Sequence, residues 1–375
     1  MERIGKKLTM KLTKYKLGDL IVQRREKNNN YDVPIRGVSK DGFIPAKQKE
    51  ADTSIYNVFY KYDFVFNPAR MELNSIALNL EYDKALCSSL YEVFYVKDES
   101  VVLPEFLNLH IKRDEFARHC DYIGLGSARE YCRFANIADF DIELPPIEVQ
   151  EEIVEADRLI KQSIRLNNQM IQNLEATAQA LYRKTFVDNI DKENLPEGWR
   201  MGTLGEVVEC YDSKRRPVAG YDRDKMDSSK KIYPYYGAAA LMDYVDDYIF
   251  DGDYILLGED GTVINEDNTP VVQYVRGKFW VNNHAHILKG KNGFDENLLY
   301  LMLSKADVHE LVTGGVQAKI NQENLMKIPV TIPQQGILEN AKGQVASIFR
   351  YIYIKQQENE KLTELQSLLL AKMEQ

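Results

Sequence analysis

The chain has 375 residues, a formal net charge of −9, 44% hydrophobic residues and 28% charged residues. This length and balance are typical of a globular protein with two domains, and they exclude a disordered or fibrous chain. The acidic excess argues mildly against a nucleic-acid partner, but a basic face can exist in an acidic chain because net charge does not describe charge distribution.

The N-terminal segment has basic side chains but lacks the apolar run of a secretory signal, and no segment has the roughly 20 apolar residues of a membrane span. We therefore expect a cytoplasmic protein. The cysteines form no CxxC pair and are expected to be reduced, buried thiols. They are Cys87, Cys120, Cys132 and Cys210.

In chain order, residues 15–147 mix β-like runs, such as 91–96, with at least one helix, around 104–120, which starts after a proline. A long amphipathic helix is predicted over 148–187. A polar linker that ends at Trp199 marks a domain boundary. The second half, 188–334, is again α/β, and a second long helix is predicted over 335–375. Within this second half we expect strands at 254–257, 271–275 and 284–288, and a helix at 296–311.

The two halves are related by an internal repeat. The motif that begins at Leu17 recurs 187 residues later at Leu204, and the segment that begins at Ile142 recurs 188 residues later at Val330. Residues 62–67 resemble 252–257 at an offset of 190. Such periodicity indicates that one structural unit has been duplicated.

Both long helices carry a mainly apolar seam with alternating steps of four and three residues, in register at an offset of 188. Seams of this period pair as coiled coils. A helix of about 38 residues is about 57 Å long, which disfavours the alternative that each helix packs only on its own domain. The expected coiled-coil and partner-docking residues are Ile160, Ile164, Ile171, Leu174, Leu181, Ile348, Ile352, Leu362 and Leu369.

No catalytic motif is evident in the sequence. No P-loop is present, and residues 67–70 are a poor approach to the Pro-Pro-aromatic turn of adenine methyltransferases. His284 and His286 could form a metal pair on one strand, but no third ligand is evident, so a structural role is favoured. We expect no catalytic residue, no metal and no cofactor.

Several segments suit recognition of nucleic acid. Lys214, Arg215 and Arg216 lie in a basic loop suited to phosphate contact, although a plain solvated loop is nearly as well supported. Tyr235 and Tyr236 belong to an aromatic turn that suits a planar or groove-shaped partner, with a hydrophobic turn as the alternative. A glycine loop contains Gln317 and Lys319, and its counterpart in the first half contains Arg129; such side chains can read base edges.

Taken together, residues 195–199, 233–238, 252–261, 314–317 and 328–333 resemble the specificity subunit of type I restriction-modification systems. The resemblance covers essentially the whole chain. It implies two α/β target recognition domains (1–147 and 188–334) and two conserved helices (148–187 and 335–375) that form an antiparallel coiled coil with pseudo-twofold symmetry. Each domain would read one half of a split DNA site. The helices would dock two modification (methyltransferase) subunits, and restriction/translocase subunits would complete the complex.

The first half matches the family less closely. It has residues 67–70 where the second half has 257–261, and residues 34–38 are expected to replace the Pro-Tyr-Tyr-Gly turn. The expected DNA-binding residues of the first half are Arg36, Lys40, Arg70, Arg129 and Arg133.

The leading hypothesis is a non-catalytic DNA-binding subunit whose helices set the spacer of a split site. Half-site centres would lie within roughly 17 base pairs, from helix length and the rise of duplex DNA. The competing hypothesis is a coiled-coil scaffold whose α/β domains bind protein partners. An enzyme with an unrecognised site is a third possibility.

Overall fold

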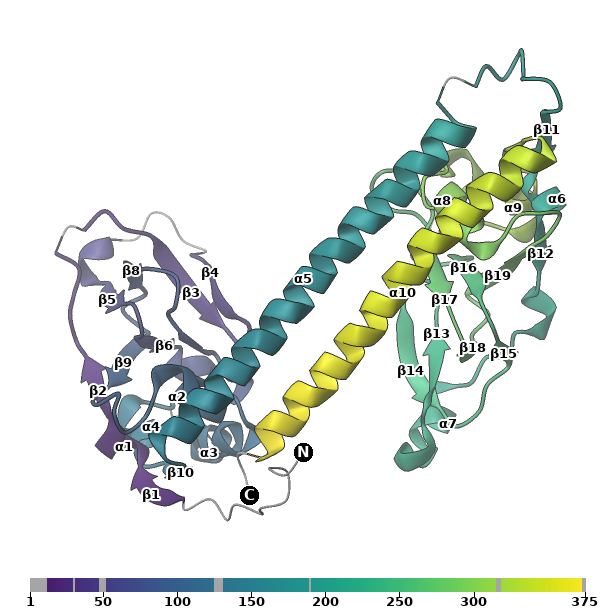
Figure 1. Ribbon diagram of the computed structural model, residues 1–375. Coiled ribbons are helices and arrows are strands. Elements are labelled where there is room, and N and C mark those ends of the chain that lie inside the picture. The colour runs from purple at the N-terminus through teal and green to yellow at the C-terminus, as the bar shows by residue number, and fades with distance from the viewer. Residues whose placement is uncertain are drawn as a thin grey trace, which may run out of the picture. The chain divides into compact units, whose positions relative to one another are not determined.

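The computed structural model describes residues 12–29, 31–46, 52–124, 131–188, 190–314 and 318–372. The chain divides into two compact units, Met1–Ile164 with Glu360–Gln375, and Arg165–Asn359. Each unit holds one globular domain and parts of two long helices, α5 (Ile147–Phe186) and α10 (Gln335–Lys372), which both continue from one unit into the other (Figure 1).

The first domain is built on two four-stranded sheets and one two-stranded ladder. One sheet has the order β2-β9-β6-β7 (Ile21–Arg24, Glu92–Val96, Phe64–Phe66, Ile76–Leu78). The other has the order β4-β3-β8-β5 (Gly42–Pro45, Ile35–Ser39, Lys84–Cys87, Asn57–Tyr60). The ladder joins β1 (Thr13–Lys16) to β10 (Asp141–Leu144). Among these described strands, β3 and β8 alone pair in parallel.

The helices of the first domain are short. They are α1 (Leu17–Leu20), α2 (Pro104–Ile111), α3 (Asp114–Gly124), α4 (Phe134–Ala138) and the 3-10 turns η1 (Thr53–Ile55) and η2 (Pro68–Leu73). The segment 104–120, where at least one helix is expected, thus holds two helices, α2 and α3. Lys112 ends α2, and its Nζ donates to the carbonyls of Ile76 at 2.6 Å and Lys40 at 2.9 Å. These tertiary contacts hold the break between α2 and α3.

The second domain repeats the first, strand for strand. Its sheets have the orders β12-β19-β16-β17 (Val208–Cys210, Ala285–Gly290, Tyr254–Gly258, Val272–Val275) and β14-β13-β18-β15 (Leu241–Val245, Tyr233–Tyr236, Lys278–Val281, Phe250–Asp251). Its ladder joins β11 (Arg200–Thr203) to β20 (Pro329–Ile332). The parallel pair is here β13 with β18, the counterpart of β3 with β8. The duplication inferred from the sequence is thus a duplication of topology.

The helices of the second domain are α6 (Leu204–Val207), α7 (Gly220–Asp224), α8 (Glu296–Leu303), α9 (Gln322–Met326) and the 3-10 turns η3 (Asp212–Lys214), η4 (Ser228–Lys230) and η5 (His309–Leu311). The helix predicted over 296–311 ends at Leu303, and only a 3-10 turn occupies its expected last residues. Ser304 caps α8, and the amide of Val308 donates to the carbonyl of Asn268 at 3.0 Å. A contact with a distant loop therefore competes with helix extension.

In each domain the main core cluster lies between one sheet, β2-β9-β6-β7 or β12-β19-β16-β17, and the short helices. In the first domain, Phe64 and Phe94 on neighbouring strands stack with ring centroids 4.7 Å apart, and Phe106 of α2 belongs to the same cluster. In the second, Ile255 and Leu288 of the sheet join Leu298 of α8. Runs of apolar residues buried on both faces of a strand require such cover, which explains why each sheet is followed by a helix.

The long helices pair antiparallel in each unit. In the first, Gln366 Nε2 donates to Asp157 Oδ1 at 2.6 Å. In the second, Asn167 Nδ2 donates to Asn359 Oδ1 at 2.9 Å, and Ala178 shares a core cluster with Phe349. Later residues of α5 thus meet earlier residues of α10. All the predicted seam positions are buried or half-buried. The predicted fold, two similar α/β domains joined by two long antiparallel coiled-coil helices, is confirmed.

Within the ranges that the structure describes, no helix is both long enough and apolar enough to cross a lipid bilayer.

Candidate nucleic-acid interface

A pocket of about 440 Å³ in the first domain brings together three of the arginines expected to bind DNA. Arg36 comes from β3, Arg70 from the turn η2 that follows β6, and Arg133 from the residue before α4. None of the described residues that line the pocket is acidic. We call this site the arginine pocket.

Two of these guanidinium groups are held in place by neighbours. The Nε of Arg36 donates to the Tyr82 hydroxyl at 2.8 Å, and the group lies 4.9 Å from the centre of that ring. Arg133 donates from Nη1 to Glu92 Oε1 at 3.2 Å and lies 5.2 Å from the centre of the Tyr131 ring. Aromatic faces attract such cations and fix their orientation. Each guanidinium keeps further N–H donors beyond these contacts.

Arg70 differs from the other two because it is exposed, and its side chain makes no hydrogen bond or ion pair with any described residue. Its position is set by the local sequence. Asn67 Oδ1 accepts from the amide of Ala69 at 3.1 Å, and Pro68 opens the turn, as a capping residue and a first-turn proline do in helices. The amide of Cys132 donates to the Pro68 carbonyl at 3.1 Å, which places Arg133 beside the turn.

The backbone pairing shows which residues of the second domain take these places. Arg36 pairs with Cys87, the last residue of β8, and Tyr236 pairs in the same way with Val281, the last residue of β18. Residues 34–38 therefore do replace the Pro-Tyr-Tyr-Gly turn, as expected.

On the other side of the pocket, a backbone hydrogen bond identifies the equivalent residues. The Glu259 carbonyl accepts from the amide of Ile320 at 2.9 Å, as the Pro68 carbonyl accepts from Cys132. Glu259 thus corresponds to Pro68. Asn321, which caps α9, corresponds to Arg133, which caps α4.

At this equivalent place the second domain has a network of opposite charges. Glu259 pairs with Arg215, and its Oε1 lies 3.2 Å from Lys319 Nζ. Arg215 Nη1 also donates to the Ala285 carbonyl at 3.0 Å, and the Arg215 side chain is only 16% exposed. Burial raises the pKa of Glu259, but the Arg215 hydrogen bond and the charge of His286 outweigh it, so that this pKa lies below its ordinary value.

His286 is fully buried, and its Nδ1 lies 3.9 Å from Glu259 Oε2 of this network. Its Nδ1 is 2.6 Å from Asp212 Oδ2, and its Nε2 is 2.8 Å from the carbonyl oxygen of Ile320. Asp212 Oδ1 also accepts from the amide of Ile287 at 2.9 Å. Burial raises the pKa of Asp212, but the hydrogen bond to His286 and the charge of His286 lower it by more. The pKa of Asp212 therefore lies below its ordinary value.

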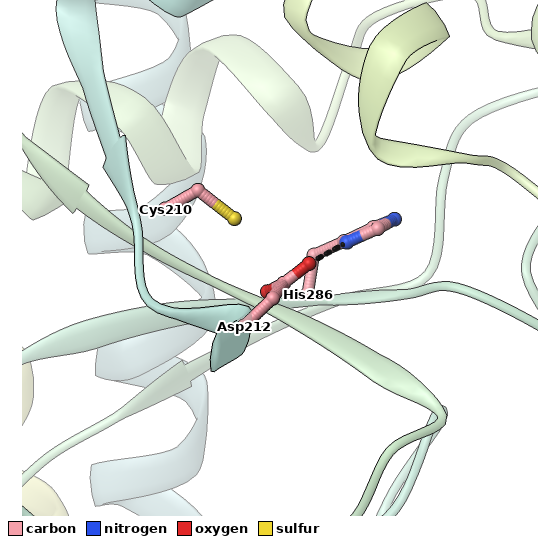
Figure 2. Close-up of side chains that lie close together, drawn as sticks. All are labelled: Cys210, Asp212 and His286. Carbon is pink, nitrogen blue, oxygen red and sulfur yellow. Dashed lines mark hydrogen bonds and ion pairs between the residues drawn. The ribbon is translucent and has the colours of Figure 1, made fainter. Parts of the chain in front are cut away.

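Cys210, Asp212 and His286 each offer a possible metal-ligand atom within 4.8 Å of the others (Figure 2). The group does not fit a metal, because both imidazole nitrogens face hydrogen-bond acceptors and neither presents a free lone pair. Burial raises the pKa of the Cys210 thiol to about 12. Asp212 and His286 thus form a hydrogen-bonded pair inside the domain rather than part of a metal centre.

The histidines expected on one face of a strand thus have different surroundings. His284 precedes β19, is exposed, and forms a short hydrogen bond with Asp260. His286 is inside the domain. Sequence reasoning had not connected either of them to the acidic loop 259–260, and the Asp212 partner of His286 lies 74 residues away.

The remaining predicted residues lie in varied environments. Lys40 is exposed in the turn between β3 and β4 and does not line the arginine pocket. Lys214 and Arg216 are exposed, and Tyr236 is half-buried. Tyr235 is only 2% exposed and is a packing residue, with its hydroxyl accepting from the amide of Val218 at 3.1 Å. Arg129 and Gln317 lie outside the described residues.

A second candidate surface lies on the long helices. The predicted docking residues are in the seam, but large apolar side chains also occur outside it, and they are exposed. In the second unit they include Leu166 and Met170 of α5 and Tyr351 and Ile354 of α10; in the first, Leu159 of α5 and Leu365 and Leu368 of α10. All seven lie at the two heptad positions, c and g, on one flank of the seam. We call them the docking face.

Comparison with known proteins places the chain in a family. The family described as "Type I restriction modification DNA specificity domain" matches residues 11–176 and 196–368. A protein assigned as a type I restriction enzyme specificity subunit in Haemophilus influenzae is 32% identical over 154 residues, 41% of this chain and 37% of that protein. The EcoprrI specificity subunit of Escherichia coli is 23% identical over 142 residues, 38% of this chain and 33% of that protein. The matched segments thus span little more than a third of these relatives.

A solved structure agrees with the fold. The S subunit of a type I restriction-modification system from M. genitalium superposes with a TM-score of 0.60 at 14% sequence identity, over 98% of this chain and 96% of that one. Both copies of the duplicated unit are matched by the same family, and together the matches cover most of the sequence. The chain therefore belongs to the family of type I restriction-modification specificity subunits, with two target recognition domains.

Proposed function

We propose that this chain is the DNA-reading subunit of a type I restriction-modification complex and carries out no chemistry of its own. Each recognition domain would bind one half of a split duplex site in the cytoplasm. Methyl transfer would belong to two modification subunits, and ATP-dependent translocation and cleavage to restriction subunits. The observation that carries this proposal is that the strand order is repeated while the side chains at equivalent surface positions differ.

A repeated scaffold with different surfaces is suited to reading two unlike sequences. Arginine can make paired hydrogen bonds to guanine or to phosphate, and acidic groups can accept from cytosine. The arginine pocket of the first domain and the network around Glu259 in the second therefore present different donors and acceptors. We propose Arg36, Arg70 and Arg133 as contacts in the first domain, with Lys214, Arg216 and Tyr236 in the second.

The docking face supports the proposed partners. Exposed leucine, isoleucine and tyrosine side chains at regular helical spacing mark surfaces that bind other proteins. In an antiparallel pair the g positions of the two helices adjoin each other, so that each unit offers one apolar face built from both helices. The repeat thus provides two similar faces, which matches two identical modification subunits.

The first test is DNA binding. The full chain, alone and with a methyltransferase partner, is titrated with random duplex in a mobility assay. Binding of duplex supports the proposal. A chain that binds partner proteins but no duplex in either state would favour the competing function, a coiled-coil scaffold, for which the exposed Leu241, Met242 and Tyr244 of β14 offer a further protein-binding edge.

The second test concerns the spacer. Removing one heptad from both α5 and α10 shortens the pair by about 10 Å, which corresponds to about 3 base pairs. The preferred spacer should shorten by that amount. Removing a heptad from one helix alone is the control, because it disrupts the register of the seam. An unchanged spacer in a folded double-deletion variant would contradict the role of the helices as a ruler.

A further inference from the structure

The two domains differ most in charge at one structurally equivalent place. In the first domain this place holds three arginines, and no described lining residue is acidic. In the second, Tyr236 replaces Arg36, Asn321 replaces Arg133, and Glu259 replaces Pro68. The strand pairing that defines these positions is the same in both domains, whereas the side chains at these positions differ.

The shape of the pocket indicates the kind of group it takes. Base edges are recessed in the grooves of duplex DNA, whereas backbone phosphates protrude from it. A concave pocket therefore meets a phosphate more readily than a base edge. Its wall is partly apolar, with Val38, Ile44 and Pro45 among the lining residues, and charge interactions are stronger beside such a wall than in open water.

We propose that the arginine pocket anchors a phosphate of the DNA backbone, and that the second recognition domain has no equivalent anchor. This inference rests on the proposed function and assigns a ligand class to one of its sites. It makes the two half-sites unequal: the first is held strongly by a sequence-independent contact, and the second depends more on contacts to its bases.

The three arginines have different roles in the pocket, because their contacts differ. Arg36 and Arg133 are oriented beforehand by Tyr82 and by Glu92 with Tyr131, so that little side-chain freedom is lost when an anion binds. Arg70 is exposed and unengaged among the described residues, and can close over the anion. Guanidinium groups bind phosphate oxygens in paired hydrogen bonds, which suits such a clamp.

The equivalent place in the second domain offers a phosphate no unpaired cation among the described residues, because Arg215 and Lys319 both pair with Glu259. Its arginine, Arg215, already donates to Glu259 and to the Ala285 carbonyl. Asp260 adds a second carboxylate next to Glu259, with His284 as its partner. A phosphate brought to this place meets two carboxylates whose cations are already engaged.

Salt dependence of binding tests the proposal, because each phosphate contact contributes about 0.9 to the slope of log Kobs against log salt concentration. The full chain is titrated with a random duplex at several salt concentrations, as wild type, as Arg70→Gln, and as the control Arg158→Gln. Arg158 is an exposed arginine of α5, paired with Glu155 and outside the pocket. Arg70→Gln should lower the slope by about one unit and weaken binding of all sequences alike. The control should leave the slope unchanged.

Thermal unfolding shows whether the variants are folded. Because Arg70 is exposed, its replacement should not change folding. An unchanged slope in a folded Arg70→Gln protein that still binds duplex overturns the inference but not the proposed function. Loss of affinity confined to duplexes with one particular base, at unchanged slope, also overturns it and makes the pocket a base reader. Absence of duplex binding by the wild type, both alone and with a methyltransferase partner, contradicts the proposed function itself.

Inorganic phosphate separates the two sources of the anion. If a free phosphate were the true ligand, millimolar phosphate would bind to the wild-type chain, measured by calorimetry, more tightly than an equal concentration of sulfate, and would displace duplex. We expect weak binding without such preference, because one phosphate lacks the rest of the DNA interface. Tight, phosphate-selective binding would overturn the DNA assignment.

Discussion

The two recognition domains share their sheets strand for strand, yet they place their charged groups differently. In the first domain, Arg36, Arg70 and Arg133 surround an apolar-walled pocket, and among the described residues only Arg133 of the three has a carboxylate partner, Glu92. The second turns Arg215 inward against Glu259 and buries His286 against Asp212. The strand order is thus the same in both domains, while equivalent positions carry side chains of different charge. In the proposed function, the shared scaffold would determine where each half-site is bound, and the side chains would determine which sequence is read.

The largest effect is expected from breaking the buried pair of the second domain. Asp212→Ala leaves His286 facing an empty acceptor site and removes the bond to the Ile287 amide, and loss of one partner of a buried pair costs about 3–5 kcal/mol. Urea unfolding of the full chain, followed by hydrogen exchange in each domain, measures the loss. Asp212→Asn, which keeps the shape and an acceptor, is the matched control and should cost less. A loss below about 1 kcal/mol for alanine would show that the pair does not stabilise this domain.

A smaller effect is expected on the helices, where the two units resemble each other. The double variant Leu166→Asp with Ile354→Asp places negative charges in the docking face of the second unit. It should weaken binding at one partner site by about 2 kcal/mol or more, roughly 30-fold. Mass measurement of the assembled complex should then find one modification subunit instead of two.

The exposed Gln172 of α5 lies outside the docking face, so that Gln172→Asp is the control and should still assemble with two subunits. Leu159→Asp with Leu368→Asp should remove the other subunit instead. Full assembly by both double variants would contradict the docking face.

In the seam, the expected change in the free energy of unfolding is smaller, about 1 kcal/mol. Asn167 and Asn359 form a polar pair between the helices, and such pairs fix register at some cost in stability. Replacing both by leucine should raise the free energy of unfolding by about 1 kcal/mol and loosen the choice of register. Urea unfolding gives the first quantity and disulfide trapping between engineered cysteines gives the second. A less stable double variant would mean that the pair also stabilises the seam.

Acid should affect the two domains in opposite directions through their buried aspartates. Asp212 has a lowered pKa in the folded protein, so its stabilisation is present near neutral pH and is lost as the pH falls through that value. Burial raises the pKa of Asp63 despite Arg24, so its contribution is present at low pH and is lost as the pH rises.

Hydrogen exchange of two amides that donate to these carboxylates, Ile287 and Tyr60, measures the difference. On acidification, protection of Ile287 should fall before that of Tyr60. If protection of the Tyr60 amide were lost first, the directions given for the two pKa shifts would be wrong.

Much of the fold could be predicted because it rests on local patterns. The seams of α5 and α10 follow from a period of seven residues, and the repeat gave the correspondence between residues 34–38 and the turn of the second domain. The break after α2 could not be predicted, because it depends on the contact of Lys112 with the distant Ile76 carbonyl.

The site was predictable only in part. The sequence named Arg36, Arg70 and Arg133, but their convergence depends on sheet pairing and on the bond between Pro68 and Cys132. Arg215 was expected at a DNA backbone, whereas its guanidinium faces Glu259, 44 residues further along the chain. Charge neutralisation by a distant partner leaves no local signal in a sequence.

The most direct test of the central claim, one scaffold that reads two different half-sites, is selection of duplexes from a random library by the full chain with its methyltransferase partner. The wild type should select a motif of two short parts separated by a spacer of any sequence. Replacing the half-buried Tyr236 by alanine should alter only one of those parts. A single continuous motif, or a variant in which both parts change together, would contradict the account.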